Sequence, residues 1–153
     1  REDLIREDVL PETPTIMRYD VQAKAGSLFN TPPCYGIYIC GKVFKWLKDQ
    51  GGLTAMKKRN EEKAKILYDF LDQSSLFKGT VRKEDRSLMN VPFVTGNEEL
   101  DAKFVKEAAA AGFVNLKGHR TVGGMRASIY NAMPKAGVEK LVEFMKKFEE
   151  ENA

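Results

Sequence analysis

The sequence contains few residues that bind metals or form disulfides. Its 153 residues include two cysteines and one histidine. Cys34 and Cys40 form neither a CxxC motif nor a zinc-ligand pattern, and a disulfide between residues six apart in a helix is geometrically poor. We therefore expect both to be buried free thiols, as in a reducing compartment, and we expect no metal site.

The sequence also lacks long apolar runs and a strong excess of one charge. No apolar run reaches the roughly 18 residues that a membrane span requires, so we expect no membrane partner. Its 25 Lys and Arg and 22 Asp and Glu leave a net charge of +3. Because the two signs are interspersed, we expect no nucleic-acid partner, and an RNA-binding α/β domain has little support.

What remains is the composition of one ordinary globular domain, with 42% hydrophobic and 31% charged residues. The first residue is Arg1 rather than Met. We interpret this start as a sign of cleavage or of a longer parent protein.

Hydrophobic periodicity predicts an α/β fold in which helices cover a mostly antiparallel sheet. The predicted helices cover 35–47, 53–71, 100–108 with a stop at Gly112, and 138–148. The predicted strands cover 88–94, 113–116 and 125–130, after a possible strand end at Leu4-Ile5. Pro92 predicts an edge strand or a bulge, and Asn97 predicts a helix N-cap.

Several single residues allow two interpretations. Trp46 lies on an apolar stripe, which favours a core position over a stacking platform. The run of Lys, Arg and Glu in 53–71 is interpreted as a solvated helix face. Arg86 is either a salt-bridge anchor or a site residue. Asn30 and Thr31 either cap a helix or bind a phosphate.

The strongest candidate site is the stretch 116–128, where three glycines flank His119 and Arg120 and where Arg126 begins the next strand. Glycine lets the backbone turn sharply and approach a ligand, and arginine binds carboxylates and phosphates in a bidentate manner. The stretch therefore indicates an anion receptor; the alternative is a tight strand connection with solvated charges. It matches neither a Walker P-loop nor GxGxxG.

The same stretch resembles the phosphoserine aminotransferase family. The resemblance rests on GHRTVGGMRASIYNA at 118–132, NTPP at 30–33, WLK at 46–48 followed by GGL, and RSLMNVPF at 86–93. It implies the small C-terminal domain of the fold type I pyridoxal-phosphate transferases in 26–153. Residues 1–25 would then be the tail of the large cofactor-binding domain or an entry segment.

The resemblance also implies an activity. The family is homodimeric and cytoplasmic, and it uses pyridoxal 5'-phosphate to transfer an amino group from glutamate to 3-phosphohydroxypyruvate. The products are phosphoserine, in serine biosynthesis, and 2-oxoglutarate; relatives act on phosphohydroxythreonine in pyridoxine biosynthesis.

Family roles transfer to five residues of this sequence. Arg126 matches the arginine that binds the substrate α-carboxylate, and His119 and Arg120 match the pair that binds the substrate phosphate or the distal carboxylate of glutamate. Asn30 and Thr31 match residues that reach across the dimer to the cofactor phosphate.

No lysine here has the family's Schiff-base context. We expect that lysine upstream of Arg1, so that the chain by itself contains no catalytic residue, binds no cofactor and is inactive. The alternative is a stand-alone anion-binding or interaction module of the same fold without catalysis.

Overall fold

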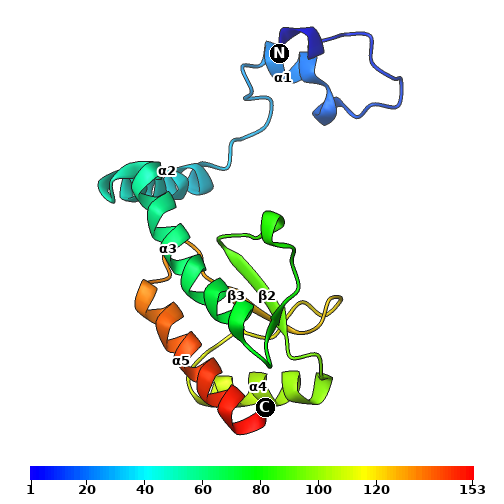
Figure 1. The fold of residues 1–153 in the computed structure, drawn as a ribbon. Coiled ribbons are helices and arrows are strands. Elements are labelled where there is room, and N and C mark those ends of the chain that lie inside the picture. The colour runs from blue at the N-terminus through cyan, green and yellow to red at the C-terminus, as the bar shows by residue number, and fades with distance from the viewer. The chain divides into compact units, whose positions relative to one another are not determined.

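A computed structural model describes residues 1–153, which divide into two compact units, Arg1–Trp46 and Leu47–Ala153. Figure 1 shows the elements along the chain. The predicted domain boundary after residue 25 stays a prediction.

The first unit contains little regular structure before its long helix. Two 3-10 helices cover Glu2–Leu4 and Thr15–Met17, helix α1 covers Tyr19–Lys24, and helix α2 covers Cys34–Asp49, with its last residues in the second unit. The predicted strand end at Leu4-Ile5 is wrong, because the Ile5 amide donates to the Glu2 carbonyl at 2.9 Å and closes a 3-10 turn.

Helix α2 has no buried residue, although its sequence is strongly apolar. Trp46 is 40% exposed, and Cys34 and Cys40 are both exposed free thiols. The predictions of a core Trp46 and of buried thiols are therefore wrong. Periodicity correctly predicted the helix, but no element of the first unit packs over its apolar side.

The second unit is an α/β arrangement with a three-stranded antiparallel sheet in the order β1-β2-β3, which confirms the predicted fold class. The strands are β1 (Lys78–Gly79), β2 (Asn90–Val94) and β3 (Met125–Ser128). The helices are α3 (Gly52–Gln73), α4 (Glu98–Ala110) and α5 (Lys135–Asn152).

Pro92 lies in the central strand rather than at an edge, which corrects the prediction. Its carbonyl accepts from the Thr80 amide at 3.4 Å, so its missing N–H faces the β1 side of the sheet. Since β1 ends at Gly79, one residue before Thr80, a proline there costs little pairing.

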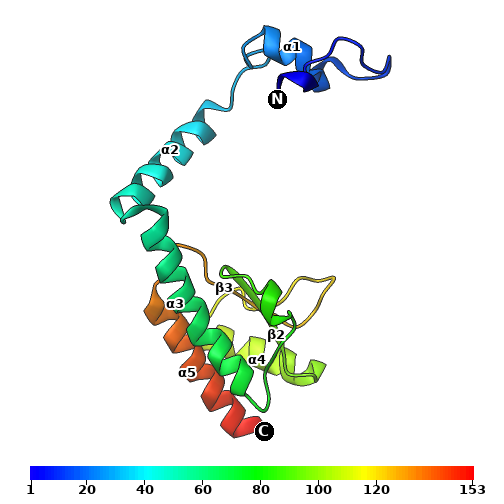
Figure 2. The same cartoon turned by 45° about the horizontal axis from the view of Figure 1, so that its top comes forward.

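The core lies between one face of the sheet and the helices. Val91, Phe93, Met125 and Ala127 alternate inward along β2 and β3, whereas Arg126 and Ser128 face the other side. Helices α3 and α5 run side by side (Figure 2). Phe104 of α4 lies edge-on to Phe77 and Phe148, with centroids 5.1 Å apart in both pairs.

The connection from α4 to β3 is not the strand that was predicted for 113–116. Asn97 caps α4 as expected, since its side chain accepts from the amides of Glu99 and Leu100. After the helix, Gly112 and Asn115 have φ values of +91° and +62°, which interrupt an extended strand. Only an isolated bridge, Lys117 with Met125, remains of the expected pairing.

The charged run of α3 is not entirely a solvated face, because Lys63 is only 3% exposed. Its Nζ donates to the carbonyls of Ile129, Tyr130 and Met133 at 3.2, 2.8 and 3.0 Å. All three protons of the ammonium therefore have acceptors in the segment between β3 and α5.

Candidate anion-binding site

The loop that precedes β3 is closed by its own backbone. The Gly118 amide donates to the Gly124 carbonyl and the Arg126 amide donates to the Leu116 carbonyl, both at 2.8 Å. At the tip, the carbonyl of His119 accepts from the amides of Val122 and Gly123 at 2.9 and 2.8 Å. The predicted glycine-rich stretch thus forms an antiparallel loop over 117–125.

Two glycines allow this closure. A Cβ atom on Gly118 would lie 2.0 Å from the Gly123 carbonyl oxygen, which no side chain tolerates. Gly124 has a φ of +60°, and a Cβ there would lie 2.6 Å from Val94 Cγ1 on β2. The glycines are therefore needed for close backbone approach within the loop and against the sheet.

A cavity of about 740 Å³ lies between this loop and the start of α4. Lys117, His119 and Arg120 line the loop side, and Glu98 and Asp101 line the helix side. Asp101 Oδ1 already accepts from the amide and the hydroxyl of Thr95, at 2.8 and 2.7 Å. Lys117 is a lining cation that the sequence prediction did not assign, although it lies within the predicted stretch.

Arg126 does not line this cavity. It is half-buried on the sheet face opposite the core and pairs across the ladder with Pro92. Its Nε atom is buried and has no hydrogen-bond partner, as is also true of Arg86, but Arg126 has no acceptor for its terminal nitrogens either. A buried guanidinium N–H without an acceptor is unfavourable, and an anionic ligand would supply the acceptor.

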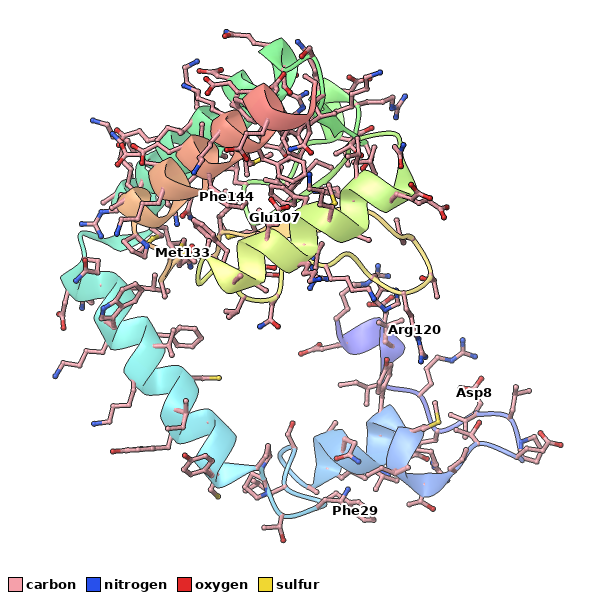
Figure 3. The ribbon with its side chains drawn as sticks, turned by 90° about the horizontal axis from the view of Figure 1, so that it is seen from below. Asp8, Phe29, Glu107, Arg120, Met133 and Phe144 are labelled. Carbon is pink, nitrogen blue, oxygen red and sulfur yellow. The ribbon has the colours of Figure 1, made fainter.

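Arg120 and Arg126 differ from every other arginine of the chain. Neither side chain has an acceptor, whereas each other arginine donates to a carboxylate or an amide oxygen; the pairs are Arg1–Asp3, Arg6–Asp8, Arg18–Asp20, Arg59–Gln50, Arg82–Asp85 and Arg86–Asp72. Figure 3 shows Arg120 on the loop, away from Phe144 in the helix layer. The two free guanidinium groups thus both belong to the predicted stretch 116–128, one lining the cavity and one on the sheet.

Arg86 is the salt-bridge anchor of the two alternatives. Its Nη1 donates to Asp72 Oδ2 at 3.0 Å, and its guanidinium lies 4.4 Å from the centroid of the Tyr68 ring. The hydrogen bonds from Arg86, with a smaller contribution from Lys83, lower the pKa of Asp72 to about 2.

Asn30 and Thr31 lie in the first unit, in the bend before α2, and both are exposed. Neither side chain forms a hydrogen bond within the chain, so the predicted capping role is not observed. Their predicted contact with a cofactor phosphate stays a prediction.

Metal sites and membrane-spanning helices were both expected to be absent. No group of three or more His, Cys, Asp or Glu side chains is arranged to bind a metal ion. None of the helices combines the length and apolar character that crossing a membrane requires.

Comparison with known proteins identifies the class. The model of the class-V aminotransferases matches residues 10–141, so the chain belongs to the class-V aminotransferase family. The phosphoserine aminotransferase of Streptococcus suis is 57% identical over 154 residues, which cover 98% of this chain and 42% of that protein. The phosphoserine aminotransferase of Haemophilus influenzae is 56% identical, over 97% of this chain and 42% of that protein.

Solved structures agree with the sequence relatives. The phosphoserine aminotransferase from Bacillus circulans subsp. alkalophilus has a TM-score of 0.89 at 46% identity, over 100% of this chain and 42% of that chain. The pyridoxal-phosphate-bound phosphoserine aminotransferase from Trichomonas vaginalis has a TM-score of 0.84 at 41% identity, over 95% and 42%. The predicted resemblance is confirmed, and the chain spans about two fifths of the length of these relatives.

Proposed function

We propose that this chain forms the substrate-anion-binding part of a cytoplasmic phosphoserine aminotransferase in serine biosynthesis. The proposal depends on one observation: Arg120 and Arg126 are the two arginines whose side chains have no hydrogen-bond acceptor within the chain. Phosphohydroxypyruvate, glutamate and their products each present two anionic groups, and two free guanidinium groups match that chemistry. We extend the same proposal to an activity in pyridoxine biosynthesis.

Each cation has a proposed role. Arg126 binds the α-carboxylate of the substrate, and its buried, unpartnered Nε is a donor for one carboxylate oxygen. His119 and Arg120, together in the loop cavity, bind the phosphate of phosphoserine or the distal carboxylate of glutamate. Binding both ends of the substrate fixes its orientation before amino transfer.

The residues of the first unit fit a cofactor phosphate. The amide of Asn30 and the hydroxyl of Thr31 are exposed hydrogen-bond donors without partners in the chain, which is the donor chemistry a phosphate accepts. We propose that they bind the phosphate of pyridoxal 5'-phosphate across a homodimer interface. When bound, this cofactor supplies the electron sink for amino transfer.

A chimera tests the proposal. In the relative that is 57% identical, the matching segment is replaced by this chain, and growth without serine is measured in a strain that lacks phosphoserine aminotransferase. We expect growth, loss of growth with Arg126→Gln, and no effect of Arg82→Gln, which changes an exposed arginine paired with Asp85. Normal growth of the Arg126→Gln chimera would overturn the proposal.

We further propose that the 153-residue chain alone neither turns over phosphoserine nor binds the cofactor covalently. The chain is incubated with pyridoxal phosphate, reduced with borohydride and mapped by mass spectrometry. We expect no single labelled lysine. Stoichiometric labelling of one lysine together with turnover would refute this part.

A stand-alone anion-binding module is the second candidate, and the free arginines favour it equally. It predicts tight binding of phosphoserine by the chain alone, whereas a partial site predicts shifts of the Arg120 and Arg126 Nε resonances only at millimolar ligand. Arg86, which is engaged by Asp72, is the internal control in the same spectra.

A further inference from the structure

His119 makes two contacts through one ring nitrogen. Its Nδ1 lies 2.8 Å from the Thr121 hydroxyl oxygen, and the Thr121 backbone amide donates to the same Nδ1 at 3.3 Å. A backbone N–H can only donate, so Nδ1 must be an acceptor with a free lone pair. A neutral imidazole whose Nδ1 is an acceptor has its proton on Nε2.

The other ring nitrogen is free for a ligand. His119 lines the loop cavity beside Lys117 and Arg120, and its Nε2 has no hydrogen-bond partner in the chain. A ring in this tautomer presents an N–H to an anion even when it is uncharged. The opposite tautomer would present a lone pair and repel the anion.

We propose that Thr121 is a positioning residue that fixes the Nε2–H tautomer of His119, so that the neutral ring remains a hydrogen-bond donor to the substrate anion. This inference rests on the proposed anion-binding function. It assigns a role to a residue that the family resemblance left without one, and it specifies which nitrogen contacts the ligand.

Thr121 is not needed simply to close the turn. The His119 carbonyl already accepts from the amides of Val122 and Gly123, and these contacts involve no Thr121 side-chain atom. Loss of the hydroxyl removes one of the two donors to Nδ1 and leaves the backbone amide, so it should weaken the preference for the Nε2–H tautomer while the loop stays closed.

The first test measures the tautomer directly. His119 is the one histidine of the chain, so a two-bond ¹H–¹⁵N spectrum of the labelled chain reports this ring without overlap. The spectra are recorded at a pH at which the same spectra show that the ring is neutral, because only the neutral ring has two tautomers. We expect the Nε2–H pattern in the wild type and in Thr121→Ser.

Thr121→Val removes the hydroxyl at nearly constant volume. We expect the ratio of Nδ1–H to Nε2–H to rise about fivefold, which corresponds to one ordinary hydrogen bond. A wild-type ring in the Nδ1–H form, or a ratio unchanged by Thr121→Val, would overturn the inference; the wild-type result stands even if the variant misfolds.

The second test asks which nitrogen contacts the anion. Glutamine and asparagine place an amide N–H near the positions of Nε2 and Nδ1 respectively. Sulfate is the probe because it is a dianion at the pH of the measurement. We expect the sulfate affinity of His119→Gln to lie within about twofold of that of the wild type with a neutral ring. We expect His119→Asn to bind roughly tenfold more weakly, because a hydrogen bond to a charged group is lost.

The other charged groups that line the cavity, Lys117, Arg120, Glu98 and Asp101, are unchanged in every variant, so their effects cancel at one pH. The reverse order of the two variants would assign the contact to Nδ1 and overturn the inference. If sulfate shifts neither the His119 nor the Arg120 signals while the tautomer is Nε2–H, the proposed anion-binding function fails and the assignment of Thr121 stands.

Discussion

Replacing Lys63 by methionine tests whether the buried ammonium stabilises the second unit. Methionine retains most of the aliphatic stem and leaves little cavity, but it removes the donor to the carbonyls of Ile129, Tyr130 and Met133. The Tyr130 carbonyl keeps a second donor, the Met133 amide at 2.9 Å. Two carbonyls therefore lose the donor that Lys63 provided.

The expected cost follows from those two carbonyls. A buried acceptor without a partner, such as the Ile129 carbonyl, costs about 1–3 kcal/mol. The carbonyl of the partly exposed Met133 adds less, and removal of the buried charge returns part of the cost. Burial also lowers the pKa of Lys63, which shows that desolvation opposes the charge. We expect Lys63→Met to reduce the free energy of unfolding by about 2 kcal/mol.

Urea unfolding followed by circular dichroism measures the change. Lys65→Met is the matched control, because Lys65 is exposed on the same helix and forms only an i,i+4 pair with Asp69; its effect should stay within about 0.5 kcal/mol. A Lys63→Met chain as stable as the wild type would show that desolvation of the ammonium cancels its three hydrogen bonds.

Two further predictions concern an ion pair and the loop backbone. Because Arg86 lowers the pKa of Asp72 to about 2, the pair contributes stability above the unfolded-state value near 4 and loses it as the pH falls through about 2. The free energy of unfolding in urea should thus be about 1 kcal/mol lower for Asp72→Asn than for the wild type at neutral pH, after allowance for solvent screening. This difference should vanish near pH 2. A difference that does not change with pH would contradict the pairing. Gly118→Ala should abolish the anion-induced shifts of the loop in NMR spectra, because its Cβ would lie 2.0 Å from the Gly123 oxygen. Gly36→Ala, which meets no neighbouring atom, should leave those shifts unchanged.

The helices and the N-cap were predictable from the sequence because their signals are local. The apolar stripe of 138–148 and the capping side chain of Asn97 each depend on residues within a few positions. The strand predicted for 113–116 failed because Asn115 adopts a positive φ, which its apolar neighbours do not indicate.

Burial was less predictable than secondary structure. The stripe that includes Trp46 indicates which side of α2 is apolar, but not whether another element covers it. Lys63 shows the opposite case, since a lysine in a charged run is buried when distant carbonyls accept all its protons. Both outcomes depend on contacts between segments far apart in the sequence.

The candidate site was predictable in its residue types and only partly in its geometry. Glycines around His119 and Arg120 indicate a loop that approaches an anion, and alternation along 125–130 indicates that Arg126 faces away from the core. The sequence could not show which arginines are already paired, because Arg86 reaches Asp72, fourteen positions away.

The two half-buried arginines of the second unit, Arg86 and Arg126, should respond in opposite ways to the same substitution. Arg86 donates to Asp72 and packs on Tyr68, so Arg86→Gln should cost about 1–3 kcal/mol of unfolding free energy. Both arginines have a buried Nε without an acceptor, but Arg126 also has no acceptor for its terminal nitrogens, so Arg126→Gln should leave stability unchanged or raise it by up to about 1 kcal/mol while abolishing phosphoserine-induced shifts. Residues kept for a ligand commonly reduce stability in its absence. Equal destabilisation by both substitutions, measured by urea unfolding, would show that Arg126 is a structural residue and would remove the main physical support for its role in substrate binding.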